Sequence, residues 1–220
     1  MTSLTDDPAT VLASGIDITP EQYGVGARFT LSAYDSDYVR IILGALGGVD
    51  ASGLATETND ISTFVTGSEQ RVAQYLRDVI AATAASGAHV SVAILLSRGC
   101  PGELQCALPA GVSALGAAPV TLASTGIRAS AHWSLYPLLD AGAPSGSATP
   151  ADHMTPIYSA IEQAKVEGVY SGSDHFATRL DGDLASVLET VANAWIAVGA
   201  TVQHVATHVT LSINSPSHSG

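Results

Sequence analysis

Polar side chains that could bind a ligand alternate with apolar ones along two segments, residues 27–33 and 129–136. A period of two is typical of half-buried strands, so we expect the polar positions to share one face of a sheet. These positions are Arg28, Thr30, Ser32, His132, Ser134 and Tyr136. Such groups can bind the polar edge of a small ring, whereas a face that only meets water usually carries more Lys and Glu. An interface satisfied by small polar groups explains the pattern equally well.

Four short segments at the ends or turns of predicted strands add backbone amides and carbonyls beside short polar side chains. They are residues 59–63, 97–101, 173–177 and 212–216. We predict ligand contacts in these segments and directly after the third, from Asp60, Ser62, Thr63, Ser97, Gly99, Cys100, His175, Thr178, Ser212, Asn214 and Ser215.

The histidines and cysteines offer weaker grounds for catalysis or metal binding. His204 and His208 lie in a period-2 pattern, which places them about 13 Å apart on a strand, too far to share one metal ion. His175 beside Asp174 is more typical of a satisfied turn histidine than of a catalyst, and no neighbouring base is visible for Cys100. We therefore predict no catalytic residue, no metal and no cofactor, and keep an enzyme using His175 or Cys100 as the alternative.

These residues sit within a repeat. Residues 36–101 align with residues 151–216 at one constant offset and without a gap. Asp37 meets Asp152, Gly53 meets Gly168, and the pair His89–Val90 meets His204–Val205. Upstream, residues 27–31 match 131–135 at a smaller offset, because residues 141–150 are inserted. Two copies of one supersecondary unit follow.

Each copy predicts the order strand, helix, strand, strand, helix, strand. The first copy has these at 27–33, 38–46, 54–58, 61–66, 69–85 and 89–96, and the second at 129–136, 154–167, 169–173, 175–180, 183–198 and 202–213. Ser36, Ser68 and Asp183 are the predicted N-caps. A βαββαβ order is ferredoxin-like: an α+β unit with an antiparallel sheet that has helices on one face and leaves the other bare. We expect the bare faces to meet another sheet, within the chain or across a dimer.

Composition limits the function classes. The net charge of −12 and the absence of a basic stripe argue against nucleic acid. Charged residues make up 13% and hydrophobic ones 46%, which favours an oligomer interface. No segment is apolar enough to span a membrane or to act as a signal peptide. Two cysteines, Cys100 and Cys106, make neither a disulfide framework nor a zinc site, so we expect a cytoplasmic protein.

Six motifs in both copies resemble the YkoF family of thiamin- and hydroxymethylpyrimidine-binding proteins. They are residues 26–31, 60–63, 98–102, 134–137, 180–183 and 211–216. The resemblance implies tandem ferredoxin-like repeats at 24–102 and 127–217, with a 1–23 extension and a 103–126 linker. It also implies a homodimer, one ligand pocket per repeat and a role beside thiamin-precursor uptake. Two departures concern the first pocket: residues 30–34 lack the Leu-Tyr-Pro element seen at 135–137, and Asn59–Asp60 stands where the family has Asp-His.

Three functions follow from these observations. The first is non-catalytic binding of thiamin or hydroxymethylpyrimidine that supports uptake or salvage, with a transporter component as a possible partner. The second is an enzyme acting on a small pyrimidine-like ring. The third is a metabolite-sensing regulatory module.

Overall fold

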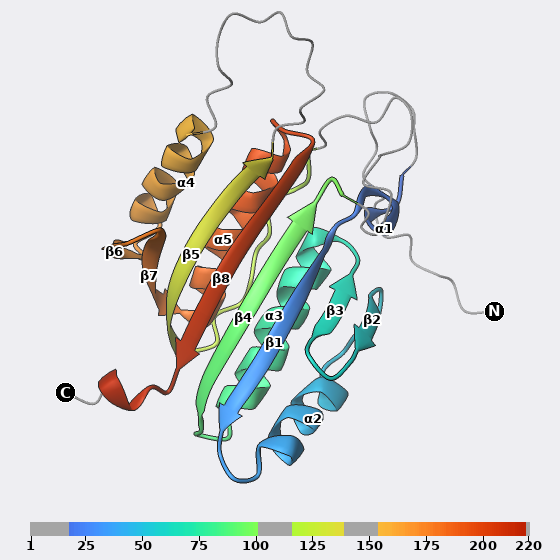
Figure 1. Cartoon of the computed structure of the whole chain (residues 1–220), viewed down its shortest axis with the longest axis vertical. Coiled ribbons are helices and arrows are strands. Elements are labelled where there is room, and N and C mark those ends of the chain that lie inside the picture. Colours follow the sequence, from blue (N-terminus) through green and yellow to red (C-terminus); the bar gives the residue numbers. More distant parts are fainter. Residues whose placement is uncertain (1–17, 101–115, 139–153, 219–220) are drawn as a thin grey trace, which may run out of the picture.

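The computed structural model describes residues 18–100, 116–138 and 154–218. Its strands form one eight-stranded sheet in the order β2-β3-β1-β4-β8-β5-β7-β6 (Figure 1). The elements are α1 (Pro20–Tyr23), β1 (Gly26–Tyr34), α2 (Tyr38–Gly48), β2 (Ala55–Thr58), β3 (Thr63–Thr66), α3 (Glu69–Ala84), β4 (His89–Arg98), β5 (Arg128–Leu138), α4 (Met154–Val166), β6 (Tyr170–Asp174), β7 (Ala177–Asp183), α5 (Leu184–Gly199), β8 (His204–Ile213) and a 3-10 turn, η1 (Pro216–His218). Each repeat therefore has the predicted βαββαβ order, and the α+β fold class is confirmed.

The alternation of side chains sets the two faces of the sheet. In β1 Ala27 and Phe29 are buried while Arg28 and Thr30 are exposed, and β4, β5 and β8 follow the same rule. The long helices α2, α3, α4 and α5 pack on the face that carries the buried residues (Figure 1). None of the described long helices packs on the other face, and we call it the bare face.

The helices begin where short polar side chains can satisfy their first amides. The Ser68 hydroxyl accepts a hydrogen bond from the Arg71 amide at the start of α3, and the Asp183 carboxylate accepts one from the Ala185 amide at the start of α5. Both caps were predicted. The prediction of Ser36 was wrong: α2 begins at Tyr38, as predicted, and its N-cap is Asp37, the residue directly before it. That helix also continues through Gly47 and Gly48, two residues past its predicted end at residue 46.

The two repeats meet edge to edge. β4 and β8 pair antiparallel along their whole length, from Val90 with Ile213 to Arg98 with Val205. The expectation of sheets packing face to face within the chain is therefore wrong. Both closing strands have an unpaired edge in the isolated repeat, and pairing them satisfies both rows of backbone groups at once. This pairing leaves the bare face continuous across both repeats.

One buried arginine connects the two repeats on the helix side of the seam. Arg98, the last residue of β4, is 2% exposed, and its Nε donates to Glu69 Oε1 of α3 at 2.9 Å. Its guanidinium also lies over the rings of Tyr23 and Trp195, 5.3 and 6.0 Å from their centroids. These contacts join α1 and α3 to α5, so the core is continuous between the repeats.

Segments outside the repeats also contribute to the core. Ile18 and the Tyr23 ring of α1 are buried, and neither was expected from the repeat alone. Val120 and Leu122, from the region predicted as a linker, are buried as well. The Val120 amide donates to Asn193 Oδ1 of α5 at 2.7 Å, which holds this stretch against the helix layer.

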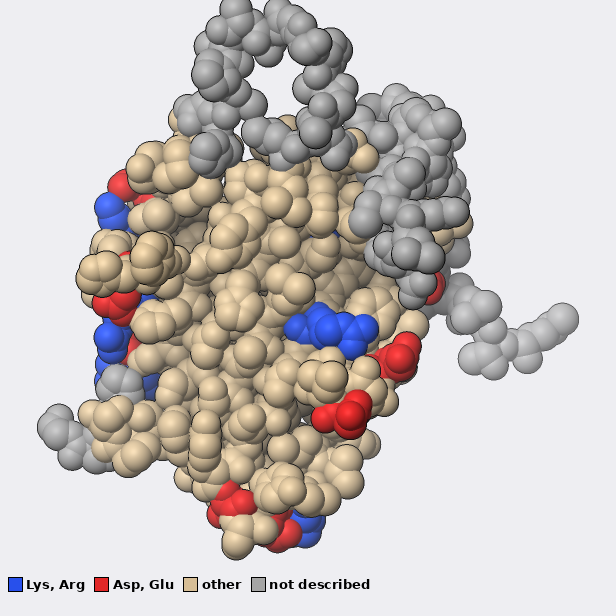
Figure 2. All heavy atoms as spheres, in the orientation of Figure 1, with Lys and Arg blue, Asp and Glu red and all other residues tan. Residues whose placement is uncertain are grey.

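Figure 2 shows the bare face as mostly uncharged, with charged side chains gathered at its margins and one basic patch over β1, the strand of Arg28. Leu95 at its centre is 45% exposed.

Among the described helices none has the length and apolar character needed to cross a membrane.

Candidate functional site

A cavity of about 530 Å³ lies in the second repeat between α4 and β5. Its volume is in the range of small-molecule sites. The lining residues are Trp133, Ser134, Leu135, Tyr136, Met154, Ile157, Tyr158, Ile161, Asp174, Phe176, Ala177 and Thr178. We call it the ring cavity, because most of its lining is apolar or aromatic and its polar groups are few.

Exposed aromatic side chains surround the opening of the ring cavity. Tyr136 of β5 is 48% exposed, Tyr158 of α4 is 60% exposed, and Phe176 at the β6–β7 turn is 98% exposed. Phe176 has φ 67°, a left-handed conformation that is uncommon for a residue other than glycine. Covering a large exposed aromatic side chain with a flat ring removes apolar surface from water, which favours binding. The three rings therefore suit a planar ligand.

The polar groups of the ring cavity are held in place by hydrogen bonds. Asp174 Oδ2 lies 2.7 Å from His132 Nε2. The Ser134 hydroxyl donates to the Phe176 carbonyl at 3.0 Å, which fixes the turn against β5. Beneath them the Trp133 indole donates to Thr207 Oγ1 at 2.8 Å, and its ring faces the helices as its place in the alternation predicted. The Asp174 carboxylate is half exposed, so it can still accept from a ligand.

The first repeat builds the same turn with different side chains. The Thr30 hydroxyl donates to the Ile61 carbonyl at 3.1 Å, as Ser134 does to Phe176. Arg28 Nη1 donates to Ser62 Oγ at 3.0 Å, and Arg28 lies over the Phe64 ring. The repeat alignment places Asn59, Ile61 and Leu43 where the second repeat has Asp174, Phe176 and Tyr158. This side therefore lacks both the carboxylate and the aromatic rings of the ring cavity.

The structure brings only part of the predicted site together. Ser134, Tyr136 and Thr178 line the ring cavity, and His132 is joined to it through Asp174. Arg28, Thr30 and Ser62 gather at the corresponding turn of the first repeat. Asp60 and His175 lie exposed at the tips of the two turns.

Other predicted residues lie elsewhere and have structural partners. Ser97 bonds His204 at 3.2 Å and Ser212 bonds His89 at 3.1 Å, two equivalent pairs across the β4–β8 seam. The Asn214 side-chain amide donates to the Ala84 and Ala88 carbonyls. Thr63 is buried and lies 3.0 Å from Thr58 Oγ1.

The remaining predicted positions are at strand ends. The Gly99 amide donates to the Tyr23 carbonyl at 3.1 Å, and Ser215 Oγ is 2.8 Å from Ser217 Oγ. Cys100 is partly exposed just after β4, while Cys106 lies outside the described residues. Among the residues that the structure describes, no group of three His, Cys, Asp or Glu side chains is arranged to hold a metal ion.

Sequence reasoning missed the wall that α4 contributes, which includes Ile157, Tyr158 and Ile161. Alternation and short polar side chains point to ligand contacts on strands and turns, whereas the apolar residues of α4 are typical of a helix that packs on the core. An available signal was Tyr158, a large aromatic in a helix whose buried residues are Ala160 and Ala164. Asp174 was noted only as a neighbour of His175.

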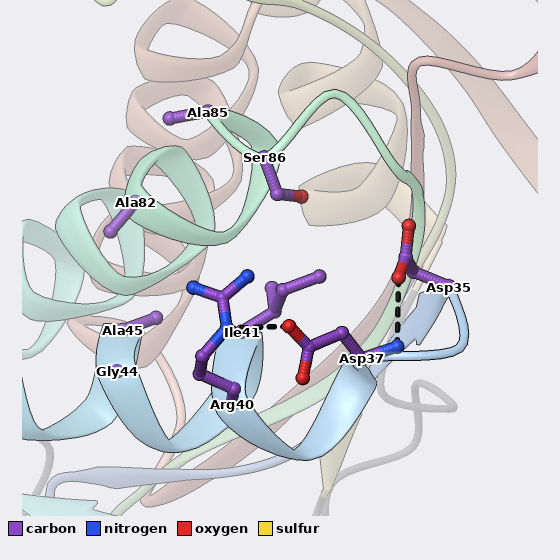
Figure 3. A pocket seen from close by; sticks show the side chains of 9 residues that line it. All are labelled: Asp35, Asp37, Arg40, Ile41, Gly44, Ala45, Ala82, Ala85 and Ser86. Atoms are coloured by element: carbon purple, nitrogen blue, oxygen red, sulfur yellow. Dashed lines mark hydrogen bonds and ion pairs between the residues drawn. The ribbon is translucent and has the colours of Figure 1, made fainter.

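A second cavity, of about 500 Å³, lies between α2 and the C-terminal end of α3 (Figure 3). Its charged groups engage one another: Arg40 pairs with Asp37 at 2.5 Å, and Asp35 accepts the Asp37 amide at 2.8 Å. The opposite wall carries Ala82, Ala85 and Ser86. None of the predicted ligand contacts lies here, so the ring cavity remains the better candidate.

The fold and the site define an α+β protein of two ferredoxin-like repeats with a ligand-sized cavity in the second. The model of the YKOF-related Family matches residues 24–103 and 128–218, and the chain belongs to this family. It is 30% identical over 197 residues to a Bacillus subtilis (strain 168) protein named "Putative HMP/thiamine-binding protein YkoF". The alignment covers 87% of this chain and 91% of that protein.

Proposed function

We propose that this protein binds hydroxymethylpyrimidine or thiamin without transforming it, and that the ring cavity is the principal site. The observation that carries this proposal is the combination of exposed Tyr136, Tyr158 and Phe176 with the Asp174 carboxylate at one cavity. An aminopyrimidine presents an exocyclic amine that donates and ring nitrogens that accept. Asp174 can take the amine, and the aromatic side chains can cover the ring. The name of the Bacillus relative supports the same ligand class.

Selectivity in such a site comes from buried polar groups. A ligand that leaves a buried donor or acceptor unmatched loses about 1–3 kcal/mol for each one. The positive thiazolium ring of thiamin is also compatible with an acidic chain and with aromatic side chains at the opening. The first repeat is the second, weaker site in this proposal, because Asn59 and Ile61 replace the carboxylate and one aromatic ring.

The biological setting is part of the proposal. We place the protein in the cytoplasm, in uptake or salvage of the thiamin precursor, with a transporter component as a possible partner. A second copy would cover the bare face, whose centre is uncharged and includes the exposed Leu95. A catalytic role for His175 or Cys100 stays a prediction that an activity assay must establish first.

Isothermal titration of the purified chain with hydroxymethylpyrimidine and with thiamin tests the function. We expect saturable binding with up to two sites per chain. Tyr158→Ala should weaken the tighter site, whereas Leu43→Ala, the same helix position in the first repeat, should leave it unchanged. Absence of binding heat with both compounds, confirmed by an equilibrium dialysis measurement, rejects the proposed function.

A further inference from the structure

The chain has only eight Lys and Arg residues, and all of them lie in described regions. Six form ion pairs with carboxylates: Arg40, Arg71, Arg77, Arg98, Arg128 and Lys165. Arg28 is engaged by Ser62 and the Phe64 ring. The last one, Arg179 of β7, has an exposed side chain that makes no hydrogen bond or ion pair to any described residue. In a chain of net charge −12, one cation is left for an outside partner.

Arg179 lines a polar cavity of about 660 Å³ at the β6 edge of the sheet. Its other lining residues are Arg128, Gly168, Tyr170, Ser171, Gly172, Ser173, Asp174 and Asp181. Three hydroxyl groups therefore line the same cavity as the guanidinium, and two of them, on Tyr170 and Ser173, lie 3.1 Å apart. Guanidinium and hydroxyl groups together are the donors that bind phosphate oxygens.

The two carboxylates of this cavity have partners other than Arg179. Asp181 accepts from Arg128 Nε at 2.8 Å and from the Ser130 hydroxyl at 2.7 Å. Its hydrogen bond to Arg128 raises the pKa of that guanidinium, which stays charged. Asp174 lies against His132 at 2.7 Å. The charge of Asp181 is therefore balanced by Arg128, whereas His132 balances that of Asp174 only when its ring is protonated. Arg179 is the guanidinium of this cavity that is not paired with a carboxylate.

The first repeat lacks this arrangement. The repeat alignment places Phe64 at the position of Arg179, and Phe64 pairs with Arg28 in the sheet as Arg179 pairs with His132. The Arg28 guanidinium is stacked on that ring. Among the described residues, the second repeat is therefore the one that places a guanidinium without a carboxylate partner in a polar cavity.

We propose that this cavity is an anion subsite that takes the phosphate of a phosphorylated heteroaromatic alcohol. Asp174 lines both it and the ring cavity, so the two are neighbours along β6. This inference rests on the proposed function of the ring cavity and specifies the form of the ligand. The second repeat binds the phosphate monoester more tightly than the parent alcohol, and the first repeat does not.

Titration at low ionic strength with hydroxymethylpyrimidine and with its phosphate monoester tests the subsite. We expect the monoester to bind the second repeat about tenfold more tightly, the value of one charge-assisted hydrogen bond. Arg179→Gln should abolish this preference and leave the affinity for the alcohol unchanged. Arg40→Gln removes the same charge from an exposed position on α2 and should keep the preference.

Equal affinities for the two compounds in the unmodified protein overturn the subsite, and so does an equal loss of preference in both variants. If neither compound binds, the ring proposal fails and inorganic phosphate decides the subsite by itself. Shifts of the Ser171, Ser173 and Arg179 amide resonances that vanish in Arg179→Gln then support it. Absence of such shifts at saturating phosphate rejects it.

Discussion

At the scale of single residues, Asp174 carries the main difference between the two turns. Its carboxylate is held by His132 and half exposed, whereas the first repeat has Asn59 at the equivalent position. The Asn59 side-chain oxygen is already engaged by the Ile61 and Ser62 amides. A ligand amine therefore meets a charged acceptor in the second repeat and a neutral, occupied one in the first.

Asp174→Asn should weaken hydroxymethylpyrimidine binding about 10- to 100-fold, because a hydrogen bond to a charged group is worth about 1.5–3 kcal/mol. Isothermal titration measures the change. Glu57→Gln, which removes an exposed carboxylate from the edge strand β2, is the control and should bind as the unmodified protein does. Unchanged affinity in Asp174→Asn would remove this carboxylate from the site.

Asp183 gives the protein a stability term that depends on pH. Burial of its carboxylate would raise the pKa, but hydrogen bonds from Ser124, Thr125, Ala185 and Gly126 outweigh it and lower the pKa below its usual value. The contribution of Asp183 to the free energy of unfolding is therefore fully present above the pKa of about 3.9 that its carboxyl has in the unfolded chain. It is lost as the pH falls through the lower pKa of the folded protein.

Asp183→Ala should reduce the free energy of unfolding at neutral pH by about 1–2 kcal/mol, the usual loss for a helix cap. The deficit should shrink as the pH approaches about 3, because the unmodified protein then loses the same term. Urea unfolding at several pH values measures it. Asp37→Ala removes an N-cap residue whose side chain makes no capping bond and should cost less. A deficit independent of pH would contradict the assignment.

At the scale of elements, the β4–β8 seam depends on a close approach of two backbones. Gly99 follows β4 with φ 83°, and a Cβ built there would lie 1.6 Å from the Gln203 carbonyl oxygen. Gly87, before β4, has nearly the same φ of 80° and open space around it. The two glycines share a positive φ and differ in crowding.

Gly87→Ala should lower the free energy of unfolding by about 1–2 kcal/mol, the cost of a left-handed alanine. Gly99→Ala should lose at least about 2 kcal/mol more, because the ends of β4 and β8 must separate to admit the methyl group. Urea unfolding of both variants gives the difference. Similar losses would mean that the Gln203 turn moves aside freely.

The order of the elements could be predicted because both repeats carry the same pattern of apolar residues. Apolar residues at every second position indicate a strand, and apolar residues with a period of 3.6 indicate a helix. Ser68 and Asp183 precede such patterns directly, which is why both caps were correct. The edge-to-edge pairing of β4 with β8 could not be predicted. Alternation of apolar and polar residues indicates which face of a strand is buried, but it does not indicate which strand pairs with it. Ring-cavity residues on β5 followed from alternation, whereas Tyr158 depends on where α4 crosses the sheet.

At the scale of the whole molecule, one continuous bare face spans both repeats. The cross-strand rows at its centre contain no Lys, Arg, Asp or Glu: Ala93 is opposite Thr210, and Leu95 is opposite His208. Exposed leucines that stand alone are common, but Leu95 lies on a face whose central rows carry no Lys, Arg, Asp or Glu, and such a face can be covered by another protein chain. This face is therefore where the proposed dimer would bury its apolar area.

Leu95→Glu should convert the dimer to a monomer, because each copy would have to bury a carboxylate without a partner in the interface, which costs several kcal/mol. Light scattering behind size-exclusion chromatography measures the mass, and circular dichroism checks that both proteins are folded. Leu43→Glu is the matched control: this leucine is 62% exposed on α2, on the opposite side of the sheet, and the variant should remain dimeric. A Leu95→Glu dimer of unchanged affinity would show that the bare face meets solvent, and the interface would have to be sought on the helix side.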